Sequence, residues 1–237
     1  MAHFDSLSAA LQAPEQVTHL NLCNQNLTHF PSEILLLKNL TTLNLSFNPL
    51  RELPPSISFL PRLEQLYLNR CKLSELPPEI NQLSQLKSLG LSENWLESLP
   101  ETLGSLHSLE QLDLSHNGLR SLPNDLSGFQ RLQSLNLICN RLSQLPESIG
   151  CLSQLKHLYL FWNQLQSLPE SIGQLSQLET LQICRNALQQ LPASLSQLTQ
   201  LRELELYENQ LSDPLKLRAS LPQTQIVWRR NQNIDVY

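Results

Sequence analysis

A 23-residue period runs through most of this 237-residue chain and limits what the chain can fold into. Written in lines of 23, the sequence places leucines in the same columns from Val17 to the C-terminal region. The seventh line, LKHLYLFWNQLQSLPESIGQLSQ, shows the template LxxLxLxxNxLxxLPxxIxxLxx. A fixed period of roughly 20 to 50 residues indicates stacked structural repeats, because a single repeat cannot bury its own apolar side chains. We therefore expect a solenoid.

Each column of the template has a physical reason. The alternating leucines of LxL predict a short strand with one buried face, and successive strands would form a parallel sheet. Proline in the Leu-Pro pair suits the first turn of a 3₁₀ or short α segment on the opposite side. The asparagine column can donate to and accept from backbone groups where the chain leaves the strand. Cys71 fills this column in the third repeat, where we expect a structural role.

Nine repeats are expected within residues 17–211, eight of them complete and the ninth incomplete. Residues 1–16 are predicted to form a helical cap, because apolar side chains lie at helical spacing within residues 3–12. Residues 212–237 are predicted to form a C-terminal cap and tail, with an irregular strand near Gln225–Trp228. The repeats begin at Val17, Leu40, Leu63, Leu86, Leu109, Leu132, Leu155, Leu178 and Leu201.

Composition narrows the classes of partner and compartment. The formal net charge is −5 and no run of Lys or Arg stands out, which argues against nucleic acid or an anionic membrane as the main partner. No apolar run approaches the roughly 20 residues that cross a bilayer, and the N-terminus does not resemble a secretory signal. The five cysteines are scattered and form no CxxC, so we expect free thiols and a cytoplasmic location.

Catalytic and metal chemistry is not predicted. His116 is one column from Asp113 and Glu93, but the nearby Ser92 and Ser115 occupy a column where small polar residues are routine. No oxyanion element or nucleophile turn accompanies them. The six glycines form no phosphate-binding loop, and no His/Cys spacing supports a structural zinc. We therefore expect neither an enzyme nor a bound cofactor.

The columns resemble the leucine-rich-repeat superfamily over essentially the whole chain. The combination of 23 residues with LPxxI is similar to the intracellular Leu-Pro subclass, which includes Ras-suppressor-like proteins, plant intracellular Ras-group proteins and many bacterial repeat proteins. The resemblance implies an α/β solenoid, a right-handed superhelix with a concave parallel β-sheet and convex 3₁₀ or short α segments. It also implies that a partner binds on the concave face, without identifying that partner.

A partner-binding patch is predicted in the last four repeats. Residues between and after the LxL leucines should face outward, and equal positions in neighbouring repeats form rows about 4.8 Å apart. Exposed clusters of Trp, Tyr and Arg are typical of binding hot spots. The predicted patch comprises Ile138, Tyr159, Phe161, Trp162, Arg185 and Tyr207, with Cys139 and Cys184 among them and Glu205 and Glu208 at the edge.

Two further interpretations accompany this patch. Phe161 and Trp162 may instead fold back and merely shield the sheet. A weaker second patch is expected at Phe47, Tyr67 and Arg70.

The leading functional hypothesis is a non-catalytic protein–protein interaction module or scaffold. The alternative from another class is a translocated bacterial effector or adhesin that uses the same face on a host protein or glycan. A third hypothesis, the recognition part of a larger enzyme such as a ubiquitin ligase, is disfavoured because only 26 residues follow position 211. Self-association through the aromatic residues is a further option.

Overall fold

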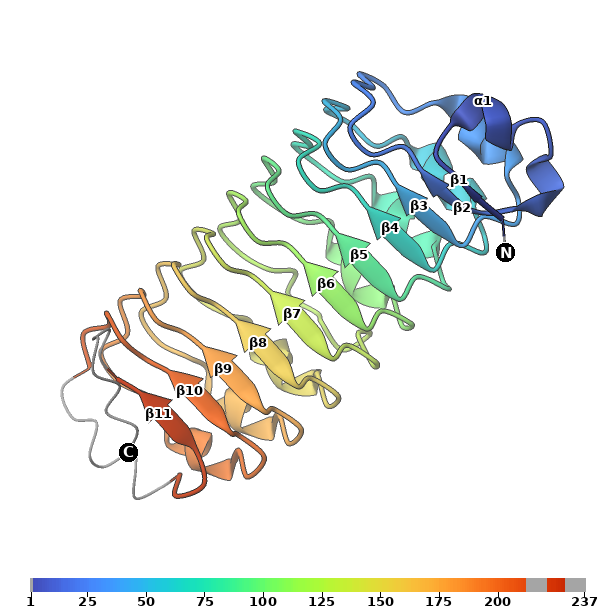
Figure 1. Ribbon diagram of the computed structural model, residues 1–237. Helices are drawn as coiled ribbons and strands as arrows, with labels where there is room; N and C mark the ends of the chain where they lie inside the picture. Colours follow the sequence, from blue (N-terminus) through green and yellow to red (C-terminus); the bar gives the residue numbers. More distant parts are fainter. Residues whose placement is uncertain (1, 212–220, 229–237) are drawn as a thin grey trace.

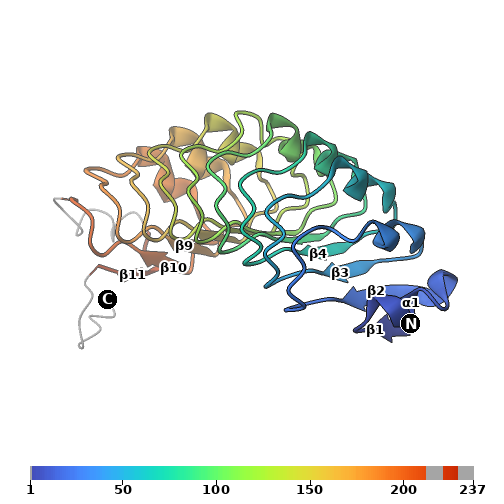
Figure 2. The ribbon, with the colours of Figure 1, turned by 90° about the horizontal axis from the view of Figure 1, so that it is seen from above.

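A computed structural model describes residues 2–211 and 221–228 as a curved stack of coils with one eleven-stranded sheet (Figure 1). The strands follow one another in chain order from β1 to β11, and neighbouring strands are parallel. The sheet lines the concave side, and short 3₁₀ helices line the convex side (Figure 2). The predicted α/β solenoid is confirmed.

The strands are short, and most span three residues. Their bounds are β1 (Ala2–Phe4), β2 (Val17–Asn21), β3 (Thr42–Asn44), β4 (Gln65–Tyr67), β5 (Ser88–Gly90), β6 (Gln111–Asp113), β7 (Ser134–Asn136), β8 (His157–Tyr159), β9 (Thr180–Gln182), β10 (Glu203–Glu205) and β11 (Gln225–Val227). The helical segments are α1 (Leu7–Ala10), η1 (Pro14–Gln16), η2 (Ser32–Leu36), η3 (Pro55–Phe59), η4 (Pro78–Gln82), η5 (Glu101–Ser105), η6 (Glu147–Cys151), η7 (Glu170–Gln174) and η8 (Ala193–Gln197), where η denotes a 3₁₀ helix.

The leucine columns set the register of the sheet. Leu43 of β3 pairs with Leu66 of β4, and each later strand repeats this pairing 23 residues further on. The central leucines of the strands are buried, and the residues on either side of them face outward. Full burial of one such side chain contributes about 1.5–3 kcal/mol before entropy is subtracted. The outward residues are therefore free to vary, because the core does not constrain them.

The Leu-Pro pairs settle the choice between 3₁₀ and α structure. Pro54 directly precedes η3, and its carbonyl accepts a hydrogen bond from the Ile57 N–H at 3.0 Å. This bond joins residues three apart, as in a 3₁₀ helix. The same arrangement follows the other Leu-Pro pairs except in the fifth repeat, where residues 123–130 form bends and turns.

A ladder of asparagine side chains links consecutive coils. Asn94 is buried, and its Oδ1 accepts from the N–H groups of Cys71 and Leu73 at 3.0 and 2.9 Å. Its Nδ2 donates to the carbonyls of Leu68 and Leu91 at 2.8 and 2.9 Å. One amide thus satisfies backbone groups in two coils, and this confirms the expected role of the column.

The N-terminal segment differs from the helix predicted over residues 3–12. Ala2–Phe4 form strand β1, which pairs with β2, and only Leu7–Ala10 form α1. The unpaired backbone groups of β2 explain the difference, because a strand can satisfy them and a helix cannot. At the other end β11 occupies Gln225–Val227, within the segment where a final strand was predicted. The rest of the predicted C-terminal cap and tail, residues 212–220 and 229–237, lies outside the described residues.

Candidate functional site

One residue in every repeat, immediately before the asparagine column, has a left-handed backbone. These nine residues, here called the left-handed row, have φ between 53° and 62° and are Asn24, Phe47, Arg70, Glu93, His116, Cys139, Trp162, Arg185 and Glu208. Left-handed backbone costs a residue other than glycine roughly 1–2 kcal/mol, and asparagine or aspartate tolerates it best. Of the nine, only Asn24 is of that kind. Neither burial nor backbone preference selects the bulky residues in the rest of the row.

The structure brings the aromatic members of the predicted patch together. Phe161 contacts both Trp162 and Tyr207, with ring centroids 6.0 and 6.5 Å apart. Trp162 is 56% exposed, and the side chains of Phe161 and Tyr207 are partly exposed. None of these three rings belongs to the buried core, which contradicts the interpretation that Trp162 folds back to shield the sheet. We keep the name aromatic patch for Ile138, Tyr159, Phe161, Trp162, Arg185 and Tyr207.

Arg185 joins the aromatic residues to the acidic edge of the patch. Its guanidinium carbon lies 5.0 Å from the centroid of the Trp162 ring and 5.7 Å from that of Phe161. Its Nε lies 2.7 Å from Oε2 of Glu208, and its Nη2 donates to Oε1 of Glu208 at 3.4 Å. Cation–π contacts and a two-point ion pair fix the long side chain in one geometry. The patch is therefore ordered before any partner arrives.

Cys184 and Glu205 lie deeper than their neighbours in the patch. Cys184 is buried, and its Sγ donates to Oε2 of Glu205 at 3.4 Å. Burial raises the pKa of the Cys184 thiol to about 12. Burial and the adjacent charge of Glu203 raise the pKa of Glu205. Cys184 is thus a structural thiol, whereas Glu203 and Glu205 crowd two carboxylates onto one outward face of β10.

Tyr159 and Ile138 extend the patch toward the middle of the sheet. Tyr159 is on β8, where its ring stacks with that of His157 at 6.2 Å and an interplanar angle of 9°. Ile138 follows β7 and is partly exposed. His157 and Glu203 were missed in the sequence, because only the columns from the LxL centre onward were considered. Strict alternation along each strand would have placed them on the outward face.

The second predicted patch repeats the geometry of the first. The Arg70 guanidinium carbon lies 5.1 Å from the centroid of the Phe47 ring, and its Nε lies 2.6 Å from Oε2 of Glu93. Phe47 is 47% exposed, and Tyr67 stands nearby on β4. We call Phe47, Arg70 and Glu93 the N-terminal triad, and Trp162, Arg185 and Glu208 the C-terminal triad. Each triad is an aromatic ring, an arginine and a glutamate in consecutive repeats of the left-handed row.

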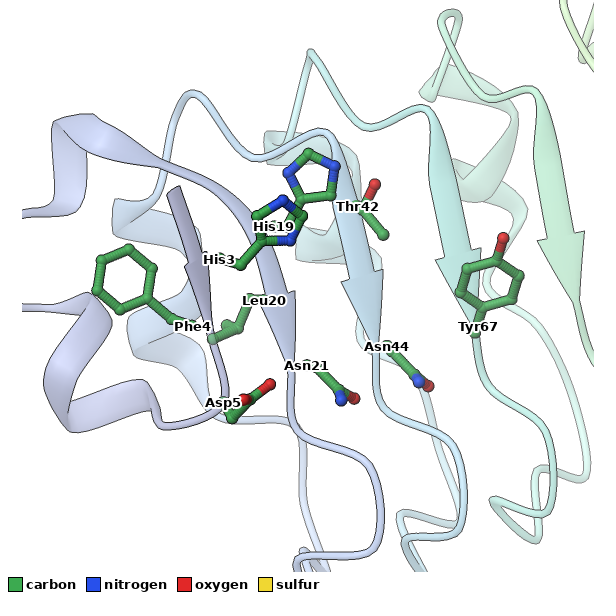
Figure 3. A pocket seen from close by; sticks show the side chains of 9 residues that line it. All are labelled: His3, Phe4, Asp5, His19, Leu20, Asn21, Thr42, Asn44 and Tyr67. Carbon is green, nitrogen blue, oxygen red and sulfur yellow. The ribbon is translucent and has the colours of Figure 1, made fainter. Parts of the chain in front are cut away.

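A shallow hollow of about 190 Å³ lies at the N-terminal end of the concave face (Figure 3). The rings of His3 on β1 and His19 on β2 stack there at 4.1 Å, and Thr18 Oγ1 lies 2.9 Å from Nδ1 of His19. Burial and the neighbouring His3 lower the pKa of His19. Tyr67 lines the far side of the hollow, next to the N-terminal triad. Sequence reasoning missed the hollow because strand β1 was not predicted.

The residues considered for catalysis have local structural partners. Oδ1 of Asp113 accepts from the N–H and Oγ of Ser115 at 3.0 and 2.7 Å. Glu93 belongs to the N-terminal triad, and His116 is exposed. Within residues 2–211 and 221–228, no three His, Cys, Asp or Glu side chains cluster in a way that would hold a metal ion. Over the same ranges, the helices are too short or too polar to span a bilayer.

Known proteins share this architecture. Models of a leucine-rich repeat region, a leucine rich repeat and a pair of leucine rich repeats match residues 124–232, 61–119 and 38–82. A leucine-rich-repeat protein of Leptospira interrogans is 33% identical, and the match covers 98% of this chain and 71% of that chain with a TM-score of 0.75. Among curated proteins, none matches.

Two other solved structures show how widely the fold is used. The plant peptide hormone receptor RGFR1, solved in complex with RGF2, is 27% identical with a TM-score of 0.80. That match covers 97% of this chain and 38% of the receptor chain. An internalin of Listeria monocytogenes, 24% identical with a TM-score of 0.69, shares the fold over 97% of this chain and 71% of its own.

Proposed function

Since the chain belongs to the leucine-rich repeat family, we propose that it is a non-catalytic interaction module that binds a protein partner on its concave face. The aromatic patch, with Glu205 and Glu208 at its edge, is the main contact surface in this proposal. The second patch, formed by Phe47, Tyr67 and Arg70, is a further contact.

Exposure of Trp162 on a left-handed backbone is the observation that carries the proposal. The ring is 56% exposed, so its burial does little for the fold, and its φ of 59° is one that tryptophan disfavours. Residues held in unfavourable backbone conformations cluster at functional sites. Tryptophan and arginine side by side are also typical of the centre of a protein interface. The receptor RGFR1, which has the same fold, was solved with a bound partner, RGF2.

Affinity capture with matched variants tests the proposal. Trp162→Ala and Tyr207→Ala should each abolish capture of a partner that the wild-type chain retains, with unchanged circular dichroism. Gln174 is exposed at the end of η7 on the convex side, so Gln174→Ala is the control and should keep the partner. Equal loss in the Gln174 variant, or full retention in both aromatic variants, would contradict the site. Light scattering of the same proteins would reveal self-association through the patch.

A bacterial effector or adhesin is the second candidate, favoured by the similarity to the Leptospira protein over 98% of this chain. It would use the same face on a host protein or glycan. A glycan array probed with wild-type and Trp162→Ala protein separates the two candidates. Glycan binding that disappears in the variant would favour the adhesin.

Location remains a proposal. All five cysteines are free thiols, and a reducing compartment keeps thiols in that state. We therefore propose the interior of a cell as the place where the module acts, either its own cell or, for a translocated effector, that of a host.

A further inference from the structure

Two sites of the same construction lie on the concave side of this chain. Phe47 and Trp162 hold the same position in repeats that are five coils apart, and each ring is covered by the arginine of the next repeat. Each arginine is ion-paired through Nε with the glutamate of the repeat after that. Each triad therefore presents an ordered apolar ring beside a neutralised charge pair. A partner with one apolar side chain would need only one such place, so two indicate a longer ligand.

The distance between the triads limits that ligand. Neighbouring strands lie about 4.8 Å apart, so five coils separate equivalent points by about 24 Å along the sheet. An extended polypeptide covers this span in about seven residues, because it advances about 3.4 Å per residue. A segment running across the strands can thus place one apolar side chain on each triad.

Charge on the same face favours a basic ligand. From β3 to β10, the strands and the left-handed row carry two arginines and five carboxylates, which are Glu93, Asp113, Glu203, Glu205 and Glu208. Both arginines are already ion-paired within the triads. Among the described residues, no cation forms an ion pair with Asp113, Glu203 or Glu205. A ligand with Lys or Arg would supply the missing positive charge.

The crowded carboxylates of β10 give one of those cations a place. Glu203 and Glu205 are two residues apart on the strand and face the same way, so an ammonium or guanidinium group can lie between them. The raised pKa of Glu205 fits this arrangement, since it reflects burial and a neighbouring negative charge without compensation.

From these observations we infer that the partner contributes one extended, basic polypeptide segment that contacts both triads at once. Its two apolar side chains, about seven residues apart, lie on the rings of Phe47 and Trp162, and a Lys or Arg lies at Glu203 and Glu205. The inference rests on the proposed function, because it names the chemistry of the partner for the same face.

Selection from a random 16-residue peptide library displayed on phage tests the inference with the whole chain immobilised. Enriched peptides are then synthesised, and their dissociation constants are measured by isothermal titration calorimetry. We expect net positive peptides that bind one to one. Phe47→Ala and Trp162→Ala should each weaken binding at least tenfold. The double variant Glu203→Gln/Glu205→Gln should weaken it several-fold and reduce its salt dependence, whereas Gln174→Ala should leave it unchanged.

The outcomes separate this inference from the proposed function. Peptides that depend on Trp162 but are acidic, or that are indifferent to Phe47, would overturn the inference and leave the binding surface in place. Peptides that bind equally well to the Trp162→Ala protein would overturn both. Recovery of no peptide with a dissociation constant below about 100 µM, which corresponds to about −5.5 kcal/mol, would also count against the inference.

Discussion

The guanidinium of Arg185 lies 5.0 Å from the centroid of the Trp162 ring, although the two residues are 23 positions apart in the chain. They are consecutive members of the left-handed row, so the stacking of coils brings them together. The contact holds the indole ring on the surface without burying it. Its effect on stability and its effect on binding should therefore be separable.

Replacing Trp162 with asparagine should barely change stability. Asparagine tolerates left-handed backbone, and relief of roughly 1–2 kcal/mol offsets the lost cation–π contact of about 0.5–1 kcal/mol and ring contact of about 0.5–1.5 kcal/mol. We expect the free energy of unfolding in urea to change by less than about 1 kcal/mol. Leu160→Ala, at a fully buried position, should cost about 2–5 kcal/mol. A loss above about 2 kcal/mol at Trp162 would mean that the ring is structural.

Cys71 is a weak member of the asparagine column, so Cys71→Asn should stabilise the chain. The thiol donates to the Leu45 carbonyl at 3.2 Å, whereas the amide of Asn94 makes two donor bonds and accepts two. A gain of about 1 kcal/mol is expected from the added hydrogen bonds. Asn94→Ala should cost about 2–4 kcal/mol, because it leaves buried backbone groups unsatisfied. Thermal unfolding followed by circular dichroism measures both, and a lower midpoint for Cys71→Asn would refute the comparison.

The thiols should react in the order of their exposure and pKa. Burial raises the pKa of Cys71 to about 11 and that of Cys184 to about 12, so little thiolate exists at pH 8. Cys151 is exposed at the end of η6. Iodoacetamide at pH 8, followed by mass spectrometry, should modify Cys151 first and the two buried thiols only after unfolding. Equal rates at Cys184 and Cys151 in the native protein would show that Cys184 is accessible.

His19 should titrate below its ordinary pKa of 6.5, because of burial and the adjacent His3. The unfolded chain then binds more protons than the folded chain as the pH falls through 6.5, so the stability contributed by neutral His19 is lost on acidification. Nuclear magnetic resonance of the histidine rings should show the His19 midpoint rising in His3→Gln. His29→Gln, in a loop outside the hollow, should leave it unchanged. An unmoved midpoint in His3→Gln would mean that the stacked ring has no electrostatic effect.

Repetition decided which features the sequence could predict. The leucine columns and Asn94 obey rules that recur in nearly every coil, so strands, register and ladder follow from alternation and hydrogen-bonding capacity. Strand β1 lies outside the period, and its pairing with β2 depends on the open edge of a sheet that local pattern does not reveal. The segment around Leu7 has helical spacing but forms only one helical turn.

The candidate site was predictable in membership more than in geometry. Outward columns correctly placed Phe161, Trp162 and Tyr207 on one surface, because the strand period fixes the face. The left-handed backbone at Trp162 was not foreseen, since glycine or asparagine normally indicates it and neither occurs there. The triads were missed for the same reason, although the order aromatic, arginine, glutamate stands twice in one column.

The parallel stacking of identical coils also governs how this surface can change. Gain or loss of one whole 23-residue unit between Phe47 and Trp162 would leave both triads intact and shift their separation by one strand spacing, about 4.8 Å. A ligand longer or shorter by one or two residues would then fit. Reach along the concave side is therefore adjustable only in discrete steps, and duplication or deletion can alter the length of the bound segment without altering the groups that hold it.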